Sequence, residues 1–486
     1  MSLRKVATGD PRRGSARARR RAPVAVVACA LLLLAACGSR RSYDELLAGE
    51  AGGGTAATTG TGTRTAGSNG SAGGTVTTTN SGAIGGDTSA TAAGSTGAST
   101  SAGGAPAGSG AATAATCAGN EAPIVLGSVG TQSGLVGSII GTSASTVQAW
   151  AAAVNAKGGL SCHQIKYLLA DDGGDPSKHQ ALVQQMVEQN HVVAFLQMDS
   201  VLTGQASVSY LSARNIPVIS SEGGSNWFYE HTNYFPVFSS GDPTLKAVFA
   251  AAVNTAKTLG KTKLGTFNCI EAAICSAVYD KAPGYAQEFG VSLAYRGQGS
   301  LVQPDFTSAC QNAKDAGVEV LAVYMDGNSI QRIGKSCNSV GFHPRIVAEA
   351  LGVTANLPQD PNLDGLQGAL LTIPWLETSN PIVAEQDQVV RQYAPGLPPS
   401  AGTMEGYVAA KVFEAAIAAT DDPTTSAGIL KGLNTINGND FSATTYPLSF
   451  PAGQTAAREY CVWTVTIAGG QYTSDGATPA ACGSGG

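Results

Sequence analysis

The pattern of apolar and polar residues predicts buried strands alternating with helices from about residue 121 onward. Ile124 to Val129 is a continuous apolar run, as in a strand buried on both faces of a parallel sheet. A long helical pattern follows and ends at Lys157, before the pair Gly158-Gly159 that favours a helix C-terminus. Asp175 and Pro176 then have the residue types of an N-cap and a first helical position.

The same alternation continues along the chain in two sets. Further strands are predicted at residues 165–170, 192–196, 217–220, 264–267, 291–295, 318–324 and 346–348, and further helices at 203–214, 243–259, 276–289, 305–316 and 328–340. Such alternation is typical of parallel sheets covered by helices. The pattern therefore predicts an α/β fold with two doubly wound parallel-sheet lobes. Ligands of such sheets bind beyond the C-terminal strand ends, so a cleft is expected where the lobes face each other.

Residues 1–36 have the features of an export signal. Basic residues from Arg4 to Arg21 precede an apolar stretch from Ala22 to Ala36, which is short for a membrane-spanning helix. The stretch ends in Leu34-Ala35-Ala36-Cys37, which resembles the lipobox of bacterial lipoproteins. In those proteins the cysteine receives fatty acyl chains, palmitate among them, and the chain is cut just before it. Cys37 is therefore the expected lipidation site, with an ordinary secretory signal and a chance cysteine as the alternative.

Residues 37–120 are predicted to be a lipidated N-terminus followed by a disordered linker. From residue 51 to residue 116 almost every position is Gly, Ala, Ser or Thr, and the charges are Arg64 and Asp87. Such a segment cannot bury enough apolar area to offset the entropy of ordering. As a flexible coil it would span roughly 45 Å, which would hold a folded part away from a membrane.

The charge of the chain argues against nucleic-acid binding, and its hydropathy argues against a membrane-spanning helix. Without residues 1–36 the chain has 21 basic and 33 acidic side chains, a formal balance of −12 compared with −5 for the whole sequence. Nucleic-acid binding needs clustered Lys and Arg, so no nucleic-acid partner is expected. No run of about 18 apolar residues occurs, so attachment to the outer face of the cell membrane is expected through the lipid anchor.

Eight cysteines remain after Cys29 and Cys37 are set aside, and disulfides are their predicted state. An even number in an exported chain favours disulfides. A metal site is less favoured because the sequence has no close Cys-x-x-Cys pair and no His-x-x-x-His pattern, and no cofactor is expected. The positions of the cysteines favour sequential pairing: Cys117 with Cys162, Cys269 with Cys275, Cys310 with Cys337, and Cys461 with Cys482.

Five short motifs occur in order along the globular part. They are Ser133-Gly134, Val154-Asn155-Ala156-Lys157-Gly158-Gly159, Asp171-Asp172 with Asp175-Pro176, Ile216-Pro217-Val218-Ile219-Ser220, and Pro304-Asp305-Phe306-Thr307. No one of them is specific alone, but the set in this order is. Through them, residues 121 to about 470 resemble the type I periplasmic binding proteins, and specifically the branched-chain amino acid (Leu/Ile/Val) and amide receptor group.

The resemblance implies an extracytoplasmic solute receptor of an ABC importer. Proteins of this group capture a small polar solute and deliver it to permease and ATPase subunits, so an amino-acid-like or amide solute is expected. A ligand-sensing receptor domain coupled to a membrane signalling protein is the alternative on the same scaffold. Three crossovers are implied near Ser240, Gly365 and Phe441, with lobe one at 121–240 and 366–440 and lobe two at 241–365 and 441–486.

The resemblance also implies which residues bind the solute. In the group, the solute carboxylate meets N–H groups and hydroxyls at helix N-termini of lobe one, and its ammonium meets a carboxylate. Glu349 is the expected partner of the ammonium, and capping of the following helix is the alternative role for each hydroxyl. Carried over by position, the ligand-binding residues are Ser133, Ser200, Ser221, Glu222 and Gly223 from lobe one, and Asn268, Tyr324, Asp326 and Glu349 from lobe two.

Two positions depart from the group and change the expected solute. Ile139 and Ala273 stand where the group has aromatic side chains, which argues against a leucine-like amino acid. Trp227 and Tyr229 follow the fourth predicted strand and are candidates for stacking on a ligand, with structural packing as the alternative.

A hydrolase on an α/β fold is a further class that the sequence disfavours. The chain lacks Gly-x-Ser-x-Gly and His-Glu-x-x-His motifs, so no enzyme and no catalytic residue are expected. The histidines have no evident nucleophile partner in the sequence; they are His163, His179, His191, His231 and His343.

Overall fold

The computed structural model of the chain describes residues 121–222 and 224–485, with the side chains of residues 134–140 left aside. The expected export signal, the expected lipidation site Cys37, the expected linker, Cys117 and Gly223 lie outside the described residues. Of the described helices, none combines the length and apolar character needed to cross a membrane.

The first sheet has five parallel strands in the order β2-β1-β3-β4-β5. Its strands are β1 (Ile124–Gly130), β2 (Ile165–Asp171), β3 (Ala194–Leu196), β4 (Val218–Ile219) and β5 (Tyr234–Phe235). Helices α2 (Gly134–Ala156), α3 (Pro176–Glu188) and α4 (Gln205–Ala213) connect the first four strands. Because β2 and β3 lie on opposite sides of β1, the strand order reverses there, and the strand ends open a crevice.

The second sheet has eight strands in the order β12-β11-β10-β9-β8-β6-β7, with β13 also paired to β11. Strands β6 to β10 pair in parallel, and β11 pairs antiparallel with its neighbours. The strands are β6 (Lys263–Asn268), β7 (Ser292–Gln298), β8 (Val320–Tyr324), β9 (Arg345–Glu349), β10 (Gln367–Leu370), β11 (Glu459–Ala468), β12 (Gln471–Ser474) and β13 (Ala481–Ser484). Helices α5 (Gly241–Thr258), α6 (Ala273–Phe289), α7 (Thr307–Asp315) and α8 (Gly327–Ser339) accompany these strands.

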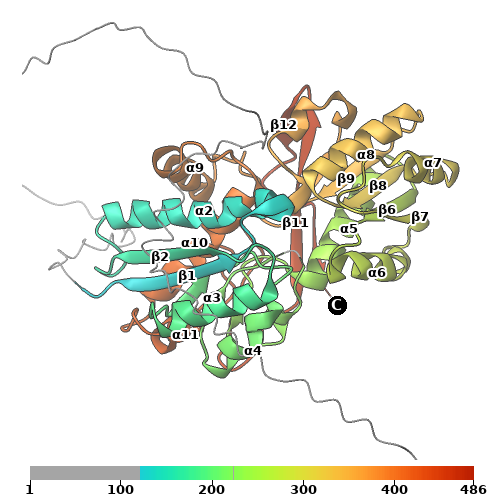
Figure 1. Cartoon of the computed structure of the whole chain (residues 1–486). Helices are drawn as coiled ribbons and strands as arrows, with labels where there is room; N and C mark the ends of the chain where they lie inside the picture. Colours follow the sequence, from blue (N-terminus) through green and yellow to red (C-terminus); the bar gives the residue numbers. More distant parts are fainter. Residues whose placement is uncertain (1–120, 223, 486) are drawn as a thin grey trace, which may run out of the picture. The chain divides into compact units, whose positions relative to one another are not determined.

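Three later helices return to the first sheet. They are α9 (Pro381–Tyr393), α10 (Ala401–Ala418) and α11 (Ser426–Leu433). Helix α10 packs along α2, and Figure 1 shows α2 with α9 beside it. Trp150 of α2 fixes this contact, because its ring meets Phe413 edge-on at 6.0 Å and its Nε1 donates to Glu414 at 2.7 Å. A segment far along the chain thus completes the helical cover of the first strands.

The helix-capping and helix-ending residues identified in the sequence have these roles in the structure. Asp175 caps α3 by accepting from the N–H groups of Ser177 at 2.7 Å and Lys178 at 3.2 Å. Gly159, at the end of α2, has a φ of +91°, and its N–H donates to Val154 O at 3.0 Å. A side chain at that position would overlap the backbone oxygen of His163, so glycine is required there.

The predicted fold class, α/β with two doubly wound parallel-sheet lobes, is confirmed. Every strand and helix predicted from the pattern occurs, with bounds shifted by a few residues. Strand β5 and all elements after residue 349 were not predicted. Strand β10 pairs with β9 and β11, so residues 367–370 belong to the second sheet although they follow the crossover expected near Gly365.

Three of the expected disulfides are present. Cys269–Cys275, Cys310–Cys337 and Cys461–Cys482 have Cα–Cα distances of 5.0, 4.9 and 4.1 Å. The last of these joins the facing positions of β11 and β13. Cys162 is also disulfide-bonded, while its expected partner Cys117 lies outside the described residues, so that pairing stays a prediction.

Candidate functional site

Two adjoining pockets lie where the C-terminal strand ends of both sheets meet. The larger has a volume of about 350 Å³ and the smaller about 20 Å³. Asp199, Ala350, Leu351 and Glu405 line both pockets, so we treat the two as one site, called the cleft from here on. Its position is that expected for a ligand site of parallel α/β sheets.

Loops after four parallel strands carry the cleft. Asp199 follows β3, Glu222 follows β4, Asn328 lies in the first turn of α8 after β8, and Glu349 ends β9. Two further side chains, Ser143 of α2 and Glu405 of α10, enter from the helices that pack together over the first sheet. Residues from both sheets therefore meet at one cavity.

Acidic side chains dominate the charge of the cleft. Asp199, Glu222, Glu349 and Glu405 line it, and none of the described residues lining it is Lys, Arg or His. Asp199, Glu222 and Glu405 are at most 7% exposed. Burial raises the pKa of Asp199 to about 7 and the pKa values of Glu222, Glu349 and Glu405 to about 8, because a charged carboxylate loses its hydration there.

Two of these carboxyl groups are held by hydrogen bonds. Asp199 accepts from Gln197 Nε2 at 3.2 Å and from the hydroxyl of Ser143. Glu222 accepts from the backbone N–H of Ser200 at 2.6 Å and from the hydroxyl of Ser225. Both groups are therefore fixed parts of the wall.

The other two carboxyl groups lack such partners. Neither Glu349 nor Glu405 makes a side-chain hydrogen bond or ion pair with any described residue. All three of Asp199, Glu349 and Glu405 line the smaller pocket, and after burial the charges of the first two further raise the pKa of Glu405. Two hydrogen-bond acceptors are thus left for another molecule.

Of the ligand-binding residues expected from the resemblance, three line the cleft: Ser221, Glu222 and Glu349. The hydroxyl of Ser221 donates to Phe238 O at 2.8 Å and accepts from Val237 N–H at 2.8 Å, so it ties the loop after β4 to the chain that leads into α5. Only Glu349 of the three has no partner among the described residues.

The other expected residues that the structure describes have structural contacts and do not line the cleft. Asn268 Nδ2 donates to Cys275 O at 2.7 Å, and the hydroxyl of Tyr324 donates to Leu245 O at 3.0 Å. Asp326 caps α8 by accepting from Asn328 N–H at 2.9 Å. The backbone N–H of Ser200 donates a hydrogen bond to the carboxyl group of Glu222, and Ser133 is the N-cap residue of α2. Gly223 lies outside the described residues.

Two aromatic candidates for ligand stacking pack within the fold instead. Tyr229 is buried, and its hydroxyl accepts from the backbone N–H of Ser240 at 3.0 Å. Trp227 packs against the core on one face of the first sheet. Neither lines the cleft.

The site also contains acids that the sequence analysis did not select. Asp199 precedes the chosen Ser200 by one residue, so a shift of one position in that loop would have found it. Glu405 lies in the largely apolar first half of α10, and its burial depends on packing between segments far apart in the chain. A lone acid among Met404, Tyr407 and Val408 was the available indication.

One histidine has a serine and an aspartate as partners, which corrects the expectation drawn from sequence. His179 Nδ1 lies 3.0 Å from Asp172 Oδ2, and His179 Nε2 lies 3.0 Å from Ser207 Oγ. The order resembles a hydrolase triad, but all three side chains are at most 1% exposed. Thr131 and Thr203 also donate to Asp172 at 2.8 and 2.7 Å. The network is closed to substrate and joins loops of the first sheet.

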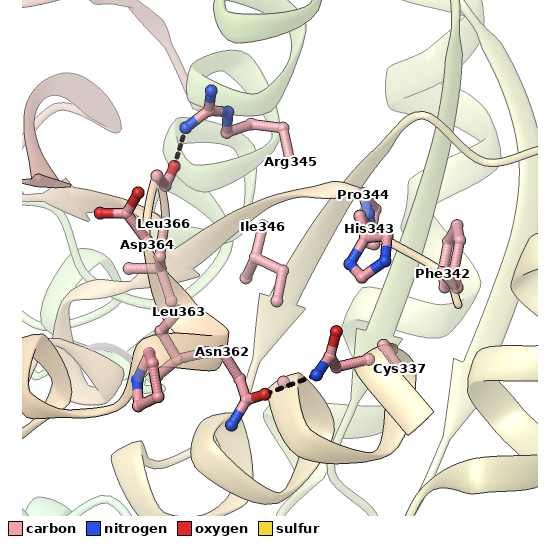
Figure 2. Close-up of a pocket in the computed structure, with 14 residues that line it drawn as sticks. Cys337, Phe342, His343, Pro344, Arg345, Ile346, Asn362, Leu363, Asp364 and Leu366 are labelled. Atoms are coloured by element: carbon pink, nitrogen blue, oxygen red, sulfur yellow. Dashed lines mark hydrogen bonds between the residues drawn. The ribbon is translucent and has the colours of Figure 1, made fainter. Parts of the chain in front are cut away.

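A second pocket, of about 270 Å³, lies at the opposite edge of the second sheet (Figure 2). Arg345 begins β9 there and donates to the backbone oxygen of Gly365, and Asn338 donates to Asn362 at 2.9 Å. Because β9 ends at Glu349 in the cleft, this pocket lies at the N-terminal strand edge. Ligands of parallel sheets bind at the other edge, so the cleft is the better candidate.

The two sheets and the cleft between their strand ends define a two-lobed binding protein, and sequence comparison gives the family. A family model described as "Periplasmic binding protein" matches residues 123–471. The chain therefore belongs to this family, of the type I class, whose members work outside the cytoplasm. Among curated proteins, none is similar enough in sequence to be matched to the chain.

Solved structures of low sequence identity share the fold. A branched-chain amino acid ABC transporter protein from Thermus thermophilus with bound valine has a TM-score of 0.64 at 15% identity, over 74% of this chain and 97% of that one. A leucine-binding protein from Thermotoga maritima has a TM-score of 0.61 at 15% identity, over 73% and 98%. A solute-binding protein from R. palustris in complex with benzoate has a TM-score of 0.58 at 15% identity, over 74% and 97%.

Proposed function

We propose that the chain is the extracytoplasmic solute-binding lipoprotein of an ABC importer. The observation that carries the proposal is the cleft, because it lies at the C-terminal strand ends of both sheets and is lined by the unpartnered carboxyl groups of Glu349 and Glu405. A volume of about 350 Å³ suits one small solute. The chain would capture that solute and present it to permease and ATPase subunits, without catalysing a reaction.

We propose a mechanism in which the first sheet's loops bind the solute and the second sheet's loops close over it. Hinge closure about a few connecting segments is a common response of two-lobed binding proteins. The lobe bounds expected from the resemblance, 121–240 with 366–440 for lobe one and 241–365 with 441–486 for lobe two, then need one change. The pairing of β10 with the second sheet favours placing the middle crossover between Leu370 and Pro381. Closure would exclude water and strengthen the polar contacts of Glu349 and Glu405.

A thermal-shift screen tests the proposal. The exported protein, purified with detergent, would be heated with amino acids, amides, amines and carboxylates. A solute at a hundredfold excess over its dissociation constant should stabilise the chain by about 2.7 kcal/mol. Glu349→Ala should abolish the shift, while Asn362→Ala in the second pocket should not change it. If no small solute raises the melting temperature, the proposed function is wrong.

A further inference from the structure

The groups expected to receive a solute carboxylate are already occupied within the protein. The N–H of Ser200 donates to Glu222 at 2.6 Å, and the hydroxyl of Ser221 donates to the backbone oxygen of Phe238 at 2.8 Å. Glu222 is itself a carboxyl group, so the protein supplies the acceptor that an amino acid would otherwise bring. A solute carboxylate would meet acids on several sides and would repel each of them that is ionised, whereas an ammonium would favour their ionised form.

The unpartnered carboxyl group of Glu405 indicates that the solute carries a positive charge. Its side chain is 6% exposed, it lines both pockets, and it makes no hydrogen bond or ion pair with a described residue. Because Glu405 lines the open volume of both pockets, an N–H donor of a solute can reach its carboxyl group there. Glu349 lines the smaller pocket in the same unpartnered state. The two acceptors favour a cation with N–H donors.

The cation that fits is organic. Within the described part of the chain, no group of three or more His, Cys, Asp or Glu side chains converges closely enough to hold a metal ion. Apolar residues also line the larger pocket, which has the room for a hydrocarbon body; they include Leu351, Val353, Ala355 and Pro398. A hydrocarbon body would contact these side chains, and the amide side chains of Asn328 and Asn356 would face its far end.

We propose that the solute is a small aliphatic amine that carries no carboxylate, with its ammonium held by Glu405 and Glu349 at the junction of the two pockets. The proposal rests on the proposed function and narrows it to one class of solute. It differs from the amino-acid-like solute expected from sequence resemblance, because that solute requires an anion-binding wall. Asp199, which also lines both pockets, contributes a third negative group near the ammonium.

A matched series of four-carbon compounds tests the inference. The probes are 1,4-diaminobutane, 4-aminobutanoate and butanedioate, with leucine as an amino acid reference, and binding is measured by calorimetry at pH 7.5. The diamine should bind at least tenfold more tightly than the zwitterion, and butanedioate should not bind. If leucine or 4-aminobutanoate binds as tightly as the diamine, the inference is wrong while the proposed function stands. If neither the amines nor the wider solute panel bind, both are wrong.

Two variants separate a role in binding from a general effect of charge. Glu405→Gln keeps the size of the side chain and removes one mutual repulsion, so it should fold and lose at least tenfold in affinity for the diamine. Asp387→Asn removes one negative charge from an exposed pair with Arg391 on α9 and should leave that affinity unchanged. Equal affinity of Glu405→Gln and the unmodified chain would overturn the placement of the ammonium.

Discussion

The backbone N–H of Ser200 donates to the carboxyl of Glu222 at 2.6 Å. This bond joins the loop after β3 to the loop after β4, at the strand ends where the cleft opens. The hydroxyl of Ser240 shares its one proton between the backbone oxygens of Glu222 at 2.5 Å and Ser225 at 2.8 Å. The acidic wall is thus connected to the start of α5, the helix that leads into the second sheet.

We predict that Cys37 anchors the protein. Cys37→Ala should prevent incorporation of a radiolabelled fatty acid and release the protein from the membrane fraction, because the modified thiol is lost. Cys29→Ala, within the apolar stretch, is the matched control and should keep the label. A Cys37→Ala protein that is still labelled and still sediments with membranes would contradict the prediction.

Removal of the Cys310–Cys337 disulfide should destabilise the folded chain. The bond closes a sequence separation of 27 residues, and the chain-entropy model assigns about 3–4 kcal/mol to a loop of that size. Both cysteines are buried, so the test is the double change to Ala, followed by urea unfolding. The same double change at Cys269 and Cys275, separated by 6 residues, should have a smaller effect. A larger loss from the shorter loop would contradict this account.

Glu349 and Tyr324 should differ in what they contribute. Glu349→Ala should weaken binding of a cationic solute by about 2–5 kcal/mol, because it leaves a desolvated charge unpaired. Tyr324→Phe removes one buried hydrogen bond to Leu245 and should lower the unfolding free energy by about 1 kcal/mol without changing affinity. Calorimetry and urea unfolding on both variants measure the two effects. Loss of affinity in Tyr324→Phe would place Tyr324 in the site.

Stability of the solute-free chain should fall as pH rises from about 5 to about 8. Burial raises the pKa of Asp199 to about 7 and the pKa values of Glu222, Glu349 and Glu405 to about 8. In this window the unfolded chain releases protons that the folded chain retains, so ionisation favours unfolding. Below the unfolded pKa values all four groups are protonated in both states, and the effect vanishes.

Glu405→Gln provides the test of this pH dependence. It should be more stable than the unmodified chain by at least about 1 kcal/mol at pH 8, since one pKa unit corresponds to about 1.4 kcal/mol, and the gain should disappear near pH 4.5. Melting curves across the range measure it. A gain that is equal at both pH values would show that the change acts through packing and not through ionisation.

Much of the fold could be predicted because its signals are local. The apolar run of β1 and the N-cap at Asp175 depend on residues close in sequence, and both are present in the structure. Strands β11 to β13 were missed because β11 pairs with β10, almost a hundred residues earlier in the chain, and β12 and β13 both pair with β11. Their position is a tertiary effect that overrides weak local preference.

The candidate site was predicted less well for a related reason. Strand ends such as that of β9 can be located from sequence, which is how Glu349 was selected. Whether a side chain such as Asp326 caps its helix or lines the cleft depends on angles that the pattern does not contain. Glu405 is brought into the cleft by the packing of α10 on α2, and no local sequence pattern predicts that packing.

The late return of the chain to the second sheet determines when that sheet can be completed. Strand β11 (Glu459–Ala468) lies between β10 and β12. In chain order it follows all the described helices, so it is synthesised after them. Until it arrives, β10 has an open edge with unpaired backbone groups that could pair with another chain. A protein exported from its N-terminus would therefore cross the membrane almost entirely before its second sheet closes. Stalled or truncated export intermediates ending before residue 459 should be the species that aggregate or are degraded.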